Sequence, residues 1–258
     1  MFTLVAFCEV DPTAAAAGDL VAAVADEHVS IAGSDIYVPE LNQLVGEYCG
    51  EGSVAAIGVG ISYGYLVSPS LRSYTRQNIS PAALHKVSPL PCMAQMHPLS
   101  PIALVKDEAL NGFLYPITTV ITDVAIIAAW LADGPIVPVI GDIRTIRCTA
   151  AAAGTAGKWT NAVMALAEDL PTGTYQVVGA KCAVTGAVGL FRLMFPAYQW
   201  RPGGLVVLSG VNDDIPAFRQ GQMGIWGEFT HRNLPRLEVL LTDTVATQVV
   251  DLDIIKIG

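Results

Sequence analysis

Histidine is the side chain best suited to act as a general base near neutral pH, and this chain has four: His28, His85, His97 and His231. None stands in a GxSxG nucleophile elbow, an HExxH zinc motif or a glycine-rich phosphate loop. His97, between Met96 and Pro98, is expected to be a loop residue. Catalysis would require His231 to meet an Asp or Glu from a distant part of the chain, so we predict that the protein is not an enzyme.

Thiols are the other candidate nucleophiles and metal ligands. The five cysteines are widely spaced and form no CxxC pair: Cys8, Cys49, Cys92, Cys148 and Cys182. An odd number at such spacing predicts free buried thiols in a protein made in a reducing cytosol, and not a zinc site.

Neighbouring acidic residues are the remaining groups with chemical potential. Asp213 and Asp214, with Asn212, offer the oxygen ligands that Ca²⁺ prefers, but solvated turn residues are the expected role. Glu168 and Asp169 are expected at the surface. Asp123 and Asp243 are expected to cap turns. We therefore predict neither a metal nor a cofactor.

Aromatic residues gather in two stretches, "FPAYQWRPGG" and "GIWGEFTHR". Tyr, Trp and Arg dominate protein interfaces, so we predict that these stretches contribute to an assembly interface. The residues concerned are Tyr198, Trp200, Arg201, Trp226 and Phe229. Core packing of the tryptophans and a carbohydrate-stacking platform remain open as alternatives.

The composition is unusually apolar for a soluble domain. Hydrophobic residues make up 52% and charged residues 14% of the 258 residues, against about 25% charged residues in ordinary domains. Such a chain is expected to cover surface against other subunits or in lipid. A net charge of −9 without a cluster of Lys and Arg argues against direct, sequence-independent binding of nucleic acid phosphates, and we expect no direct sequence-specific binding of nucleic acid. The N-terminus has no basic region, so it does not read as a secretory signal.

Similar landmarks recur along the chain and predict two copies of one unit, residues 1–146 and 147–258. "TAAAAG" occurs at Thr13–Gly18 and Thr149–Gly154. Further pairs follow at offsets of 120 or 121 residues: Gly52 and Gly173, Gly58 and Gly179, Leu71-Arg72 and Phe191-Arg192, Pro81 and Pro202, and Asp123 and Asp243. "DIRTI" at Asp142–Ile146 resembles "DIIKI" at Asp253–Ile257 at an offset of 111. Loop insertions would explain the changing offsets.

Short β-rich runs separated by Gly and Pro predict an all-β fold, a tandem β-sandwich with one or two short helices. The helices are expected at Thr160–Leu170 and, interrupted by Gly18, at Ala14–Val29. The apolar run Gly112–Ala132 contains Pro116 and Asp123 and is expected to form strands, not a membrane span. The proline-rich segment Lys86–Leu104 is expected to be an irregular connection peculiar to the first unit.

The stretches "LPTGTYQVVGAKCAVTGAVGLFRLMFPAYQWRPGG" and "GQMGIWGEF", together with the duplicated architecture, resemble double jelly-roll major capsid proteins of tailless icosahedral bacteriophages. The likeness covers most of the chain but rests on loose landmarks, because this family has no short diagnostic motif. It implies a double jelly roll, two eight-stranded units side by side. Three chains would form a trimeric, pseudo-hexameric capsomer of the shell.

The resemblance further implies a virion protein synthesised in the host cytoplasm, with other virion proteins as partners. Contact with an internal membrane is left open. The first unit's proline-rich segment would lie at a trimer contact or on an outer face. Two other functions remain as alternatives: another virion component, such as a vertex or fibre-base protein, and a tandem β-sandwich that binds carbohydrate.

Overall fold

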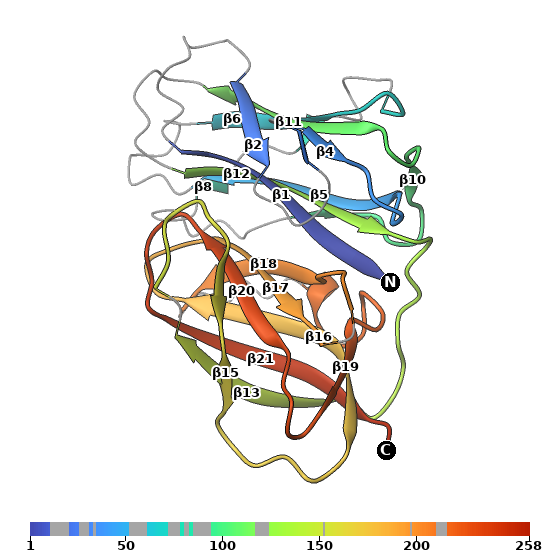
Figure 1. Ribbon diagram of the computed structural model, residues 1–258, viewed down its shortest axis with the longest axis vertical. Helices are drawn as coiled ribbons and strands as arrows, with labels where there is room; N and C mark the ends of the chain where they lie inside the picture. Colours follow the sequence, from blue (N-terminus) through green and yellow to red (C-terminus); the bar gives the residue numbers. More distant parts are fainter. Residues whose placement is uncertain are drawn as a thin grey trace.

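The chain folds into two β-structured units joined by a linker, residues 133–143 (Figure 1). The computed structural model describes residues 1–10, 21–25, 31–32, 35–51, 61–71, 78–79, 83–84, 94–116, 124–151, 153–196, 198–209 and 216–258. Within these ranges the regular structure is strand, except for one 3₁₀ turn, η2, at Pro216–Phe218. The predicted all-β sandwich fold is confirmed. No helix in the described part is long and apolar enough to cross a membrane.

The first unit has two layers that share a strand. Its strands are β1 (Phe2–Val10), β2 (Val21–Ala25), β3 (Ile31–Ala32), β4 (Asp35–Tyr37), β5 (Gln43–Glu51), β6 (Ile61–Val67), β7 (Asn78–Ile79), β8 (Ala83–Leu84), β9 (Gln95–Met96), β10 (Ile102–Ala103), β11 (Ala109–Pro116) and β12 (Val124–Ala132). In one layer β1 pairs with β12, β12 with β5, and β5 with β9 and β10. In the other, β4, β11, β6 and β7 are neighbours. Strand β2 pairs with both β1 and β11 and so connects the layers.

The second unit is built in the same way. Its strands are β13 (Arg144–Ala151), β14 (Thr160–Ala162), β15 (Met164–Leu166), β16 (Thr174–Val184), β17 (Gly189–Met194), β18 (Gly203–Leu208), β19 (Gly227–Thr230), β20 (Arg236–Leu241) and β21 (Thr247–Lys256). One layer has the order β15, β13, β21, β16, β19. The other has the order β14, β20, β17, β18, and β18 runs parallel to β16 between the layers.

The two units share one strand order. In each, the first strand pairs with the last, the last pairs with a long middle strand, and that strand pairs with a later one: β1, β12, β5, β9 and β13, β21, β16, β19. The second layers correspond as β4, β11, β6, β7 and β14, β20, β17, β18. Two such antiparallel layers with the first and last strands adjacent form a jelly roll.

The residue-by-residue correspondence expected from the sequence differs from this strand correspondence. Leu71 follows β6, whereas its predicted counterpart Phe191 lies inside β17. "DIRTI" and "DIIKI" are not copies but antiparallel neighbours, because Thr145 pairs with Asp253. Strands rich in Gly and β-branched residues look alike, so similarity alone does not distinguish a copy from a pairing partner. The other first-unit landmarks, including Thr13–Gly18, Gly52, Gly58, Arg72, Pro81 and Asp123, lie outside the described residues, and common ancestry of the units stays a prediction.

Two further expectations change at the level of single elements. The two units divide at the linker, residues 133–143. The unit boundary that the sequence predicts after Ile146 therefore falls inside β13. The helix expected at Thr160–Leu170 is wrong: β14 and β15 occupy it, and burial alternates, with Ala162 and Met164 inside and Val163 outside. An alternating period indicates a strand. In the second expected helix, residues 21–25 form β2, and the remainder lies outside the described residues.

The strand prediction for the apolar run is confirmed where the structure describes it, whereas the proline-rich segment is more regular than expected. The run Gly112–Ala132 contributes to β11 and forms β12, as predicted. Of the proline-rich segment, residues 94–104 are described; they hold the short strands β9 and β10 around a turn.

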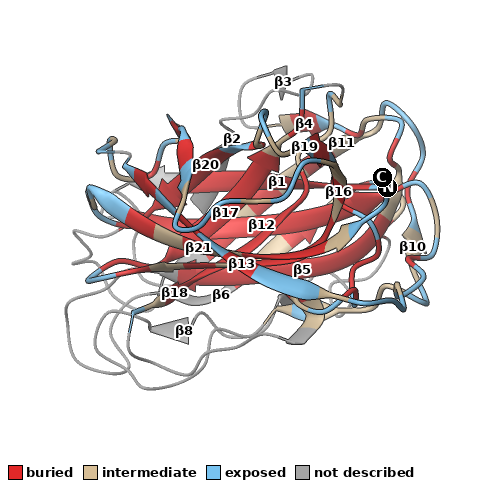
Figure 2. Ribbon diagram, turned by 90° about the horizontal axis from the view of Figure 1, so that it is seen from below, coloured by how far each residue is buried: buried red, intermediate tan, exposed pale blue. Residues whose placement is uncertain are grey.

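Strand β12 is buried along its whole length and on both faces (Figure 2). Successive side chains of a strand point to opposite faces. Ile127 and Leu131 pack into the first unit's core cluster, whereas Ile126 and Trp130 belong to the cluster that fills the second unit. Because one strand contributes to two cores, the units form one packed body.

Candidate functional site: the contact between the two units

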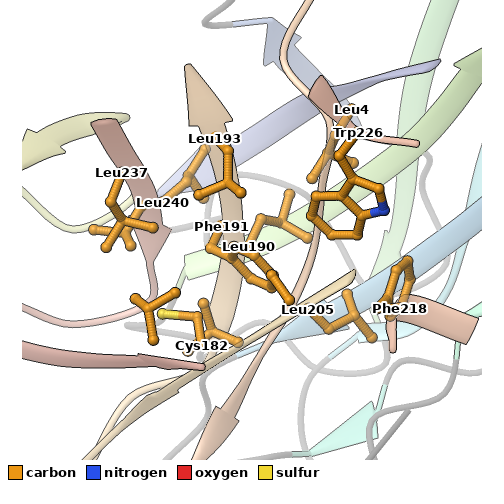
Figure 3. Packing of buried hydrophobic residues seen from close by; sticks show 14 of the residues in the cluster. Leu4, Cys182, Leu190, Phe191, Leu193, Leu205, Phe218, Trp226, Leu237 and Leu240 are labelled. Carbon is orange, nitrogen blue, oxygen red and sulfur yellow. The ribbon is translucent and has the colours of Figure 1, made fainter. Parts of the chain in front are cut away.

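The layer containing β1 and β12 packs its outer face on the second unit through aromatic side chains. The Phe2 ring meets Trp226 edge to face, with 5.4 Å between centroids, and Trp130 lies 5.4 Å from Phe218. Figure 3 shows Leu4 of β1 in the same cluster as Trp226 and other side chains of the second unit. Aromatic pairs at these separations add to the burial of apolar area.

Backbone hydrogen bonds tie β1 directly to the second unit. Among the described residues, β2 pairs with β1 at Phe7 and Cys8. Nearer the start of β1, the Leu4 amide donates to the Arg201 carbonyl at 3.0 Å. The Arg201 amide donates to the Thr3 hydroxyl at 3.2 Å. The segment before β18 therefore hydrogen-bonds to β1 near the start of that strand, as an added strand would.

Trp130 makes a directional contact across the same boundary. Its indole Nε1 donates to the Gly203 carbonyl at 2.8 Å. Gly203 has to be glycine, because a Cβ atom there would lie 2.0 Å from the Phe191 carbonyl oxygen. The missing side chain lets β17 and β18 pack closely where Trp130 binds.

A charged cluster is buried at the centre of this contact. Arg192 on β17 and Glu238 on β20 are cross-strand partners, and Arg192 Nε lies 2.5 Å from Glu238 Oε2, with side-chain exposures of 1% and 3%. Arg201 Nη1 donates to both oxygens of Glu238, at 2.7 and 2.8 Å. Arg192 also donates to the Leu4 carbonyl at 3.3 Å and lies over the Trp159 ring, 3.8 Å from its centroid. A buried ion pair is tolerated only when its hydrogen bonds are satisfied, and here Arg201 and the Leu4 carbonyl supply further ones.

The aromatic residues expected at an assembly interface lie mostly at this contact within one chain. Trp226 is buried against Phe2, and Phe229 is buried in the second unit, stacked on Tyr175 at 5.6 Å. Trp200 is half-buried against the first unit's core cluster. Arg201 binds Glu238. Tyr198 lies at the margin, edge to face with Phe195 at 6.2 Å. Trp226 and Phe229 are therefore enclosed within the chain, unlike the position between subunits that the sequence suggested.

The decisive residues that sequence reasoning did not select are Trp130, Arg192 and Glu238. The sequence holds a signal for two of them. "GLFRLMF" and "LEVLL" each place one charge inside an apolar strand. Charged residues are almost never fully buried unless they are paired. Two opposite charges in two such strands indicate a buried ion pair.

A second carboxylate, Asp253 on β21, holds the segment after η2. It is fully buried and binds Arg219 at 2.7 and 2.9 Å, the Gln220 amide at 2.8 Å and the Thr145 hydroxyl at 2.7 Å. Burial by itself raises the pKa of the Asp253 carboxyl, but these hydrogen bonds and the Arg219 charge outweigh it and lower that pKa. The arrangement is a structural anchor.

The histidines that the structure describes do not form a catalytic arrangement. His97 Nε2 lies 2.9 Å from Glu47 Oε2, and Nδ1 is buried with no hydrogen-bond partner among the described atoms. The hydrogen bond to Glu47 raises the pKa of His97, and burial opposes it less strongly. His231 Nδ1 accepts from the Gly173 amide at 3.4 Å. His28 and His85 lie outside the described residues.

The cysteines and the acidic residues considered in the sequence lie, where the structure describes them, at positions that support the fold or face solvent. The described cysteines, Cys8, Cys49, Cys148 and Cys182, are buried and form no disulfide with one another, as predicted. Burial raises the pKa of the Cys148 thiol to about 11, which keeps it protonated. Glu168 and Asp169 line an open cleft of about 400 Å³. Asp243 accepts from the Thr244 amide at 2.7 Å in the turn before β21, the role expected of it.

Metal ligands do not converge in the part of the chain that the structure describes. No group of three His, Cys, Asp or Glu side chains there could hold an ion. The acidic pair Asp213 and Asp214, with Asn212, lies outside the described residues, as does Cys92.

Comparison with known proteins adds one structural neighbour. No family model and no curated protein matches the chain. Among solved structures, the chain is similar to the crystal structure of the major capsid protein P2 from Bacteriophage PM2, with 10% identity, a TM-score of 0.24, and coverage of 100% of this chain and 98% of that chain. At this TM-score the similarity does not indicate a function.

Proposed function

We propose that the chain is a viral structural protein, a major capsid protein whose trimers form pseudo-hexameric capsomers of an icosahedral shell. The observation that carries the proposal is the contact inside the chain. Two units of one strand order pack through unlike layers, β1, β12 and β5 of the first on β17, β18 and β20 of the second.

A contact between unlike surfaces can be repeated. Among the described residues, one layer of each kind takes no part in the contact between the units and is called the free layer: β4, β11 and β6 in the first unit, and β13, β21 and β16 in the second. A head-to-tail contact between such surfaces generates a ring when the rotation closes. Three chains supply six units of one strand order, which suits a pseudo-hexameric tile.

The two free layers carry different side chains. The strands of the first unit present Tyr37 and the half-buried Phe113. Strand β13 alternates buried and exposed residues, and exposed Arg147 pairs with Asp251 of β21 at 2.8 Å. Aromatic faces and arginines favour each other at protein interfaces. Low overall charge also suits a subunit that covers much of its surface in an assembly.

The internal position of Trp226 disfavours the carbohydrate-binding alternative. Trp226 packs against Phe2 and against Phe191, whose ring lies 6.1 Å away. A stacking platform needs an open ring face, which this tryptophan does not offer to solvent.

Light scattering and negative-stain microscopy of the purified protein test the proposal. We expect trimers, three times the 27.1 kDa chain mass, and hexagonal sheets or shells at higher concentration. Phe113→Asp, on the first unit's free layer, should give monomers, whereas Val105→Asp, at an exposed position outside that layer, should not. A wild-type protein that stays monomeric contradicts the proposal, and a low copy number in purified particles would indicate a vertex or fibre-base protein instead.

A further inference from the structure

Exposed hydrophobic side chains concentrate along one edge of the molecule. Nine large ones are exposed among the described residues, and five of these lie on or beside the part of the linker that follows Ile136. These five, called the linker strip here, are Leu99, Val137, Ile140, Ile225 and Ile257. Ile140 is 97% exposed and Val137 73%. Figure 1 shows the linker running down one side of the molecule, the side on which both chain ends lie.

Backbone contacts bring the members of the strip together from distant parts of the chain. The Ile136 amide donates to the Pro98 carbonyl at 2.8 Å, which places Leu99 beside Val137. A Cβ atom on Gly224 would lie 3.3 Å from the Val137 carbonyl oxygen, so Ile225 adjoins the same segment. Further along, a Cβ atom on Gly141 would lie 3.0 Å from Ile255 Cδ1, which places Ile140 near the end of β21 and Ile257.

The linker strip continues the buried contact between the two units. Ile136 is buried and belongs to the same core cluster as Phe2 and Trp226. The next residue, Val137, is at the surface. The apolar interior of the contact therefore reaches solvent along the linker, where an isolated chain leaves it uncovered. Contiguous exposed apolar surface of this kind marks an interaction site.

We propose that the linker strip is a contact between copies of this chain in the assembled shell, separate from the contact that makes the trimer. This inference rests on the proposed function. The ring contact uses the free faces of the layers, whereas the strip lies on the linker edge and remains available after a trimer has formed. A second copy brings the same strip, so a two-fold contact would bury both.

The charges beside the strip favour a second copy over an anionic lipid surface. Asp133 pairs with the terminal amine of Met1 and Asp142 with Arg144, so these ion pairs add no excess positive charge beside the strip for anionic headgroups to bind. Arg144 follows Ile140 by four residues in the chain, and its Nη2 lies 3.4 Å from Asp142 Oδ2. A two-fold contact can place Arg144 of each copy opposite Asp142 of the other, so the charges complement each other.

The test compares two doubly substituted proteins with the wild type. In Val137→Asp/Ile140→Asp, charge replaces the two most exposed members of the strip. In the control, Val105→Asp/Val163→Asp, the same change is made at residues that are 65% and 67% exposed but lie elsewhere. Substitutions at exposed positions leave the fold nearly as stable as before, which thermal unfolding checks.

We expect the strip variant to form trimers by light scattering but neither shells nor sheets by microscopy, while the control forms both. Strip variants that assemble as the wild type does overturn this inference and leave the proposed function standing. Wild-type protein that forms neither trimers nor shells overturns both. Flotation with phosphatidylcholine and phosphatidylglycerol vesicles is the third arm: wild-type protein that floats, when the strip variant does not, assigns the strip to lipid and overturns the copy contact.

Discussion

Asp253 shows how one buried carboxylate holds together segments that are far apart in the chain. It receives hydrogen bonds from the side chains of Arg219 and Thr145 and from the backbone of Gln220. Two residues earlier on the same strand, Asp251 pairs with Arg147 at the surface. The two aspartates have the same side chain, lie on one strand and each pair with an arginine, so comparing them isolates the effect of burial on stability.

We predict that Asp253→Asn lowers the free energy of unfolding by about 3 kcal/mol, because it leaves the partly buried Arg219 without its carboxylate. Asp251→Asn should have little measurable effect, because water screens an exposed pair. Urea unfolding of the two variants measures the difference. Equal losses from both would contradict the structural role assigned to Asp253.

His97 should make stability depend on pH near neutrality. The hydrogen bond to Glu47, the titratable group that the described residues place against it, raises the pKa of His97 above its ordinary 6.5. A raised folded-state pKa stabilises fully below the unfolded value, and the stabilisation is lost as pH rises through the folded value. The melting temperature of the wild type should therefore exceed that of His97→Gln more at about pH 5.5 than at about pH 8.5. A gap that does not change with pH would show that the pair contributes nothing through protonation.

At the scale of elements, β17 and β20 each carry one charge through an otherwise apolar strand. Arg192 and Glu238 face each other across the pair, and β1 of the first unit lies over them through the Leu4 carbonyl. The strand pair and the contact between units therefore depend on the same two side chains.

We predict that Glu238→Gln destabilises the protein by about 3 to 5 kcal/mol, since Arg192 would stay buried without an anionic partner. Glu228→Gln is the matched control, because Glu228 on β19 is exposed and accepts one hydrogen bond, from Gln176 at 2.9 Å. Chemical unfolding measures both. If Glu238→Gln lowers the free energy of unfolding no more than Glu228→Gln does, the charged cluster does not stabilise the contact between the units.

The type of an element is predictable where its sequence pattern is long, and the prediction fails where the pattern is short. The apolar run Gly112–Ala132 is predicted to form strands for two reasons. It is rich in β-branched residues, and it contains Pro116 and Asp123, which do not suit a helix in lipid. The helix expected at Thr160–Leu170 was based on Val163, Leu166 and Leu170 at helical spacing. Pairing of β14 with β20 and β15 with β13 overrides that weak local preference.

At the scale of the whole molecule, the shared core predicts that both units unfold together. Trp130 of the first unit and Phe218 of the second belong to one cluster, so neither unit can open without exposing the other. Calorimetry should show a single transition whose calorimetric and van't Hoff enthalpies agree. Two separate transitions would mean that the contact contributes little to either unit.

By itself the sequence determined the class of this protein. Strand-forming runs between Gly and Pro, sparse charge and scattered thiols were sufficient to predict an all-β fold with buried cysteines, because these properties follow from local patterning and composition. The tertiary structure alone decided which strands pair, that "DIRTI" lies beside "DIIKI", and that Trp226 is enclosed within the chain. Those outcomes depend on contacts between residues far apart in the chain, such as Arg192 with Leu4 and Trp130 with Gly203, which are 188 and 73 positions apart. The docking of two layers is not encoded in any one segment.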